Sequence, residues 1–171
     1  MNRLVNQSQG MTLQTTLPYI VAVLCVVLHG IPLGLNVLPS MALGLFLVPL
    51  FAINLNSETD RAPIYFVAIG LLADILMEAP LGYWGFLAGL FYVLSSGQKQ
   101  VLQNSTFSSQ WLSFIVVVFI VYLAGFFISL LRNDLDIQFG AHLFSALITG
   151  LIYPIMAWPL NMMINAGQEG L

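Results

Sequence analysis

Two carboxylates stand inside an apolar stretch of the chain, and they are the residues with the clearest capacity for chemistry. Asp74 and Glu78 lie four residues apart in GLLADILMEAPLGYWG, residues 70–85. That spacing stacks two side chains on one face of a helix. Such acids could relay a proton or contact a ligand, or they could hold backbone amides where Pro80 breaks the chain. The sequence favours the structural interpretation and leaves the other open.

The composition of the chain predicts an integral membrane protein. Hydrophobic residues make up 59% of the 171 residues and charged residues 6%, whereas an ordinary soluble domain carries about 25% charged residues. A charged carboxylate at the centre of a bilayer costs at least about 2.5 to 3.5 kcal/mol, so Asp74 is expected to face protein or water. The net charge is −3 and the basic residues are not clustered, which gives no indication of nucleic-acid binding.

Six apolar segments are expected to be the transmembrane helices of one all-α domain, because a spanning helix needs about 20 mainly apolar residues. The domain covers residues 1–171, and the segments are residues 12–29, 37–55, 63–79, 81–95, 111–131 and 139–164. The fourth segment is short for a full crossing, and a re-entrant course is the alternative.

The orientation of these segments follows from their basic residues. Six crossings would put both termini on one side of the membrane. Arg3, Arg61 and Lys99 lie on that side, and Arg132 alone lies opposite. Because the positive-inside rule places basic loops in the cytoplasm, both termini are expected to be cytoplasmic. If the fourth segment is re-entrant, the later loops change sides, and two basic residues then lie on each side of the membrane.

The break after the third segment gives Asp74 a structural task. This residue is expected about 16 Å along the segment, past the midplane of a hydrocarbon core about 30 Å thick. The residue before Pro80 is pushed out of the helical region. The next segment begins at Leu81 and Gly82 with amides that lack helical partners, where the helix dipole favours a carboxylate. We therefore expect Asp74, supported by Glu78, to stabilise the break.

Small residues follow the break at helical spacing, at Gly82, Gly85 and Gly89. Gly85 and Gly89 form a GxxxG pattern, which lets helix backbones approach closely. Packing within the chain is the favoured interpretation, and a partner helix is the alternative. Trp84 is expected at the water boundary, where tryptophans of membrane proteins gather.

No catalytic or metal-binding motif accompanies the two acids. The sequence contains no HExxH, GxSxG, P-loop or CxxC pattern. His29 and His142 lack metal-ligand spacing, and the single cysteine, Cys25, excludes an intrachain disulfide. A membrane enzyme would need a second polar cluster facing the acids, with Asn36, Asn54 and His142 as its candidates. We therefore expect a protein that is not an enzyme and that uses no cofactor or metal.

The stretch GLLADILMEAPLGYWGFLAGLFYVL, residues 70–94, resembles the central signature of MreD, the bacterial rod shape-determining membrane protein. That family carries a Gly-Leu-x-x-Asp run, a short interval, then Pro-Leu-Gly and an apolar helix. The matching positions here are Gly70, Leu71, Asp74, Pro80, Leu81 and Gly82. Residues 35–51 are similar to the proline-led second helix of the family through Pro39. Glu78 departs from the family, which more often has a small residue there.

The resemblance implies a non-enzymatic scaffold of the cell-elongation complex, which directs peptidoglycan synthesis at the bacterial inner membrane. Its partners would be an MreC-like membrane protein, the MreB filament, a RodA-like glycosyltransferase and a class B penicillin-binding protein, besides membrane lipid. Asp74, Pro80 and Gly82 would fix a surface that receives the transmembrane helix of a partner. The family is also similar in fold to the substrate-binding subunits of energy-coupling-factor vitamin transporters, so such a subunit is the alternative function.

Overall fold

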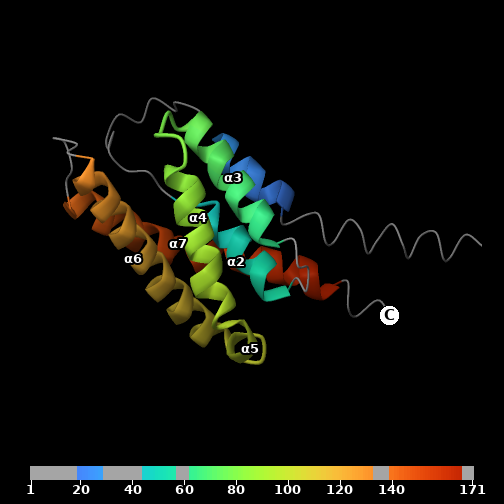
Figure 1. The fold of residues 1–171 in the computed structure, drawn as a ribbon. Coiled ribbons are helices and arrows are strands. Elements are labelled where there is room, and N and C mark those ends of the chain that lie inside the picture. The colour runs from blue at the N-terminus through green and yellow to red at the C-terminus, as the bar shows by residue number, and fades with distance from the viewer. Residues whose placement is uncertain (1–18, 29–43, 57–61, 133–138, 167–171) are drawn as a thin grey trace, which may run out of the picture.

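The structure, a computed structural model, describes residues 19–28, 44–56, 62–132 and 139–166. Every regular element in this part of the chain is a helix, so the expected all-α class is confirmed there (Figure 1). The helices are Tyr19–Leu28, α2 (Leu47–Asn56), α3 (Ala62–Leu76), α4 (Tyr83–Ser96), α5 (Lys99–Leu102), α6 (Phe107–Leu131) and α7 (Phe139–Ala166). Pro39, Asn36, His29, Arg3 and Arg61 lie outside the described residues.

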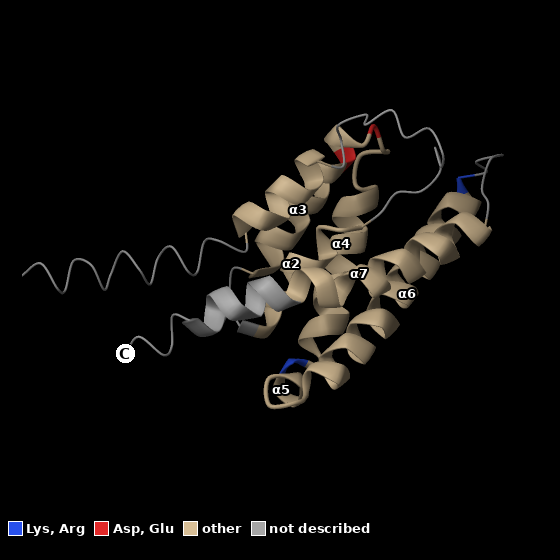
Figure 2. Cartoon of the chain, turned by 180° about the vertical axis from the view of Figure 1, so that it is seen from behind, with Lys and Arg blue, Asp and Glu red and all other residues tan. Residues whose placement is uncertain are grey.

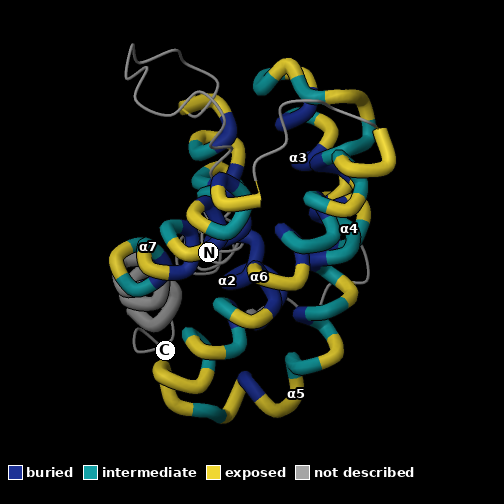
Figure 3. Tube along the Cα trace, turned by 90° about the vertical axis from the view of Figure 1, so that its left-hand side faces the viewer, coloured by how far each residue is buried: buried dark blue, intermediate teal, exposed yellow. Residues whose placement is uncertain are grey.

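The helices pack as two pairs, α3 with α4 and α6 with α7, and α2 lies between the pairs. α3 and α4 form a hairpin joined by a tight turn, and α6 packs mainly on α7 (Figure 1). α4 also lies along α6, and α2 contacts both α4 and α7. Buried positions follow the sides of the helices that face one another, and exposed positions follow the outer sides (Figure 3). The turn between α3 and α4 is therefore held by a packed pair of helices.

Two of the described helices, α6 and α7, are long and apolar enough to cross a membrane. α2, α3 and α4 have 10, 15 and 14 residues, fewer than the about 20 that span a bilayer. The six crossings therefore stay a prediction.

The structure differs from the sequence-based expectation at several helix boundaries and in one additional helix. α3 ends at Leu76 instead of continuing to residue 79. α6 begins at Phe107, four residues earlier than expected, because Phe107 and the polar residues 108–110 are already helical. The short helix α5 was not expected at all, since it lies in a polar stretch without apolar periodicity.

Aromatic rings from four helices form the centre of the bundle. Phe51 of α2 lies 6.1 Å from Phe91 of α4, 5.3 Å from Phe114 of α6 and 5.8 Å from Tyr153 of α7, measured between ring centroids. These separations lie in the range that aromatic pairs prefer, and each pair contributes about 0.5 to 1.5 kcal/mol beyond its buried area. The cluster thereby ties both helix pairs to α2.

A buried polar contact connects α2 to the end of α4. Asn54 is only 3% exposed. Its side-chain amide donates to Ser95 Oγ at 2.9 Å, and its carbonyl oxygen accepts from Ser96 Oγ at 3.1 Å. The sequence considered Asn54 as a polar partner of the two acids, but it lies at the opposite end of α4 from them. Both polar ends of Asn54 are bound there, so this candidate for a polar cluster facing the acids does not reach them.

Replacing Asn54 with alanine is expected to lower the free energy of unfolding by about 1 to 2 kcal/mol, since two interhelical hydrogen bonds are lost. Ser96→Ala removes one of them and is expected to cost about half as much. Unfolding of the purified protein in mixed micelles, followed by circular dichroism, measures both. Equal stability of Asn54→Ala and the wild type would contradict the expectation.

The charged residues of the described part lie at the ends of the helices, and the stretch between them carries none (Figure 2). Asp74 and Glu78 lie at the turn between α3 and α4. Lys99 lies in α5, immediately before α6, and Arg132 follows the last residue of α6. α6 therefore separates the two basic residues, as the sequence-based orientation requires.

Candidate functional site

The candidate site is the turn between α3 and α4, and Asp74 lies at its centre. Asp74 is in the last turn of α3 and is 1% exposed. Its Oδ1 accepts a hydrogen bond from the amide of Trp84 at 2.6 Å. Its Oδ2 accepts from the amides of Gly82 at 2.8 Å and Gly85 at 3.4 Å. The prediction that Asp74 satisfies backbone donors at the break is confirmed.

These three amides belong to the start of α4, where no preceding turn supplies acceptors. Gly82 occupies the N-cap position and has no side chain that could cap the helix. The carboxylate of Asp74 supplies the missing acceptors from eight residues upstream, and the dipole of α4 favours its negative charge. A buried acid is therefore stable here because it completes the first turn of a helix.

The backbone of Asp74 also takes part in ending α3. Its carbonyl oxygen accepts from the amide of Ala79 at 2.9 Å. This six-residue closure, with a left-handed residue just before the donor, is the Schellman arrangement of helix C-termini. Pro80 follows and prevents the helix from continuing, and its own carbonyl accepts from Tyr83 at 3.0 Å. One residue, Asp74, thus stabilises the end of α3 and the start of α4.

Glu78 does not stack on Asp74, so the predicted acid pair on one helix face is wrong. α3 has already ended, and Glu78 adopts φ 52°, the only positive φ among the described residues other than glycine. Its side chain is exposed at the turn. The left-handed conformation required by the turn carries the side chain away from the helix face that Asp74 shares. Glu78 therefore contributes a backbone conformation and an exposed charge.

Replacing Glu78 with glycine is expected to raise the free energy of unfolding by about 0.5 to 1 kcal/mol, because glycine adopts the left-handed conformation without the steric cost of Cβ. Glu78→Ala keeps Cβ and is the matched control, with little change expected. Unfolding in mixed micelles compares the two variants. If glycine were no better than alanine, backbone strain at this position would be negligible.

Glycines make the close approach of α3 and α4 possible. A Cβ on Gly70 would lie 2.5 Å from the carbonyl oxygen of Trp84 and 2.7 Å from Cα of Gly85. A Cβ on Gly85 would lie 3.1 Å from the side chain of Leu71, whereas one on Gly89 would lie 3.7 Å from Val67, an ordinary contact. The predicted packing within the chain is thus found at Gly85, and Gly89 is not required for it.

Sequence reasoning missed two residues of this site. Gly70 matched the family motif, but its packing against α4 was not foreseen. Its position four residues before Asp74, on the same helix face, was the available signal. Trp84 was expected at the water boundary and is instead 2% exposed. Its ring lies 5.5 Å from Phe46 and 6.2 Å from Tyr122, so it joins the turn to α6.

Apolar side chains remain exposed around the turn. Ile75 is 68% exposed, Leu81 85% and Phe86 58%. Leu71, one helical turn before Ile75, lies over Gly85 and is also exposed. We call these four residues the turn surface: Leu71, Ile75, Leu81 and Phe86. The hydrogen bonds of Asp74 hold the backbone beneath this surface in place.

No group of three or more His, Cys, Asp or Glu residues that could hold a metal ion is present among the described residues. His142 lies with its ring 5.9 Å from that of Phe126, far along the chain from the acids. The carboxylate of Asp74 faces three backbone amides rather than a second acid. Among the described residues, the site is therefore suited to fixing the backbone of the turn between α3 and α4 through the carboxylate of Asp74.

In the part of the chain that the structure describes, the fold is all-helical, two helices are able to cross a membrane, and α3 and α4 form a carboxylate-capped hairpin. Comparison of the chain with protein-family models, with curated proteins and with solved structures finds no match in any of the three. The resemblance to the MreD family therefore rests on the residues of the sequence motif alone.

Proposed function

We propose that this chain is a multi-pass membrane scaffold that binds the transmembrane helix of a partner at the turn surface. The composition supports a membrane location, and so do the two long apolar helices and the uncharged stretch between the ends of the described helices. The confinement of the described charges to helix ends fits a bilayer, in which a central charge is costly.

The observation that carries the proposal is that the motif residues act as one unit. Gly70 admits the backbone of Trp84, and Asp74 binds the amide of Gly82 across the turn. Pro80 accepts the hydrogen bond that closes the turn, and Leu81 is held outward by it. The residues that resemble the MreD signature are thus spaced so that together they form this turn. This shared spacing is what supports a scaffold of the cell-elongation complex as the function.

In this proposal the partner is an MreC-like protein of the bacterial inner membrane. The wider complex would include the MreB filament, a RodA-like glycosyltransferase and a class B penicillin-binding protein. Helices associate in lipid through close packing rather than through the hydrophobic effect. A rigid turn is suited to this, because a surface already held in its bound shape loses little conformational entropy on binding. Both termini would be cytoplasmic, because Arg3, Arg61 and Lys99 would share their side of the membrane and Arg132 alone would lie opposite.

A matched pair of variants tests the turn surface. Ile75 and Ile64 both lie on α3, and each is 68% exposed, but only Ile75 adjoins the turn. We expect Ile75→Ala to lower the recovery of the partner several-fold in affinity purification from membranes and to weaken the rescue of rod shape. Ile64→Ala is expected to leave both unchanged. Equal effects of the two substitutions would count against the turn as the binding site.

The identity of the proteins recovered tests the wider assignment. Cell-wall elongation proteins would support the scaffold of the elongation complex. Recovery of a pair of ATPases would favour the alternative, a substrate-binding subunit of an energy-coupling-factor vitamin transporter. Because both subunit types are membrane-embedded, the same purification discriminates between them.

A further inference from the structure

A proline lies inside the long helix α7, away from the turn surface. Pro154 is the sixteenth of the 28 residues of this helix. Because proline has no amide hydrogen, it cannot donate the helical hydrogen bond to the carbonyl four residues earlier, which belongs to Gly150. Gly150 is buried, and a buried carbonyl without a donor is costly. At Gly150 the helix α7 therefore needs a donor from another part of the chain.

Trp111 of α6 supplies this donor. Its indole Nε1 donates to the carbonyl oxygen of Gly150 at 2.9 Å, an ordinary length for a hydrogen bond of this type. The indole has a single N–H group and no acceptor, so this bond uses all of its hydrogen-bonding capacity. The side chain of Trp111 thus takes the place of the amide that Pro154 lacks.

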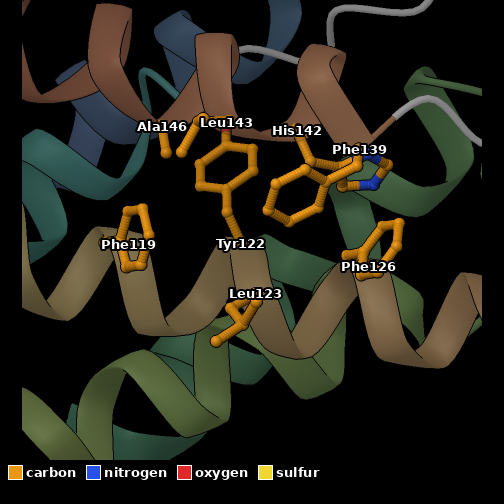
Figure 4. Close-up of a pocket in the computed structure, with 8 residues that line it drawn as sticks. All are labelled: Phe119, Tyr122, Leu123, Phe126, Phe139, His142, Leu143 and Ala146. Atoms are coloured by element: carbon orange, nitrogen blue, oxygen red, sulfur yellow. The ribbon is translucent and has the colours of Figure 1, made fainter.

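The small size of Gly150 lets α6 come close enough for this bond. A Cβ at Gly150 would lie 3.0 Å from Cγ1 of Ile115, which follows Trp111 by one helical turn. Toward the end of α6 and the start of α7, Phe126 and Phe139 instead line a small hollow between the two helices (Figure 4). The close contact at Gly150 therefore coincides with the position at which α7 lacks a hydrogen bond of its own.

The part of α7 beyond Gly150 connects this helix to α2. Tyr153 is 2% exposed, and its ring lies 5.8 Å from that of Phe51 in α2 and 4.5 Å from that of Phe114 in α6. Ala157, one helical turn later, is also 2% exposed. Because a helix bends where its hydrogen-bond ladder is interrupted by proline, a bend at Gly150 would displace both residues. The direction of α7 at this position therefore determines how α7 meets α2.

We propose that Pro154 makes a hinge in α7 and that the indole of Trp111 holds this hinge closed. With the hydrogen bond formed, α7 runs as one continuous helix beside α6. With the bond broken, the carbonyl of Gly150 has no donor from α7, and the helix opens locally beyond that residue. Trp111 acts through this carbonyl and is a positioning residue. The hinge involves only α6 and α7, so it does not depend on the partner at the turn surface.

Hydrogen exchange of the full chain in mixed micelles, measured by mass spectrometry, tests the hinge in the wild type, Trp111→Phe, Pro154→Ala and the double variant. We expect Trp111→Phe to raise the exchange rate of residues 151–166 about fivefold, because the buried carbonyl loses its donor. In the Pro154→Ala background the same substitution is expected to raise it less than about twofold, since alanine at position 154 supplies the missing amide. An equal increase in both backgrounds would overturn the proposal, because packing of the ring would then explain it. No increase in either background would overturn it as well.

Pro154→Ala alone provides a second test if Trp111→Phe does not fold. Nuclear magnetic resonance of the chain with ¹⁵N-labelled tryptophan follows the exchange of the indole hydrogen of Trp111 with solvent. We expect this exchange to be about tenfold faster in Pro154→Ala than in the wild type, because the new helical amide competes for the carbonyl of Gly150. An unchanged rate would show that the indole does not replace the missing amide and would overturn the proposal.

Discussion

Replacing Asp74 with alanine is expected to lower the free energy of unfolding by about 3 to 5 kcal/mol. The change removes a buried carboxylate and leaves the amides of Gly82, Trp84 and Gly85 without their acceptor. Because Trp84 and Gly85 are buried, water does not readily replace the acceptor of their amides, and the first turn of α4 is expected to loosen. Unfolding in mixed micelles measures the stability, and recovery of the partner measures the effect on the turn surface.

Two controls separate this effect from loss of charge alone. Asp74→Asn keeps the shape of the side chain and one acceptor oxygen, so we expect an intermediate loss of about 2 to 3 kcal/mol. Glu78→Ala removes the other acid of the turn, which is exposed, and little change is expected. If Asp74→Ala were as stable as Glu78→Ala, the carboxylate would have no structural importance. Normal partner recovery and normal rod shape with Asp74→Ala would defeat its assignment to the binding site.

The second large effect is expected at the crossing of α3 and α4. Gly70→Ala would bring a Cβ to 2.5 Å from the carbonyl oxygen of Trp84, and a backbone atom cannot move aside without separating the helices. We expect a loss of about 3 kcal/mol or a failure to fold. Separation of the helices would also lengthen the hydrogen bonds of Asp74, so partner recovery should fall with stability.

Gly89→Ala is the matched control for this crossing. The same methyl group there would make an ordinary contact of 3.7 Å with Val67. Because alanine favours the helix over glycine, we expect a stability between the wild-type value and about 1 kcal/mol above it. Unfolding in mixed micelles compares the pair. Similar losses in Gly70→Ala and Gly89→Ala would mean that the approach of the helices does not depend on Gly70.

The sequence was sufficient to predict the part of the site that follows from local chemistry. An acid close to Pro80 in an apolar stretch must find donors, and the start of the next helix supplies amides without partners. The capping of α4 by Asp74 could therefore be inferred before the structure. The helical class followed in the same way from composition and segment length.

The conformation of Glu78 could not be inferred from spacing. Four residues separate it from Asp74, which places two side chains together only while the helix continues. The Schellman closure ends α3 at Leu76 and turns Glu78 outward. The hydrogen bond from the amide of Ala79 to the carbonyl of Asp74 ends the helix before Glu78. The same four-residue spacing would also fit a helix that continued for another turn, so the spacing could not show where α3 ends.

Composition and motif spacing thus determined that the chain is helical and apolar and that Asp74 stabilises the break at Pro80. Only the tertiary structure decided that Gly70 meets the backbone of Trp84, that Trp84 is buried against Phe46 and Tyr122, and that a hollow remains between α6 and α7. The reason is that capping involves neighbours in the chain, whereas close packing depends on which surfaces of distant helices meet. One apolar helix face does not reveal which other face it will contact.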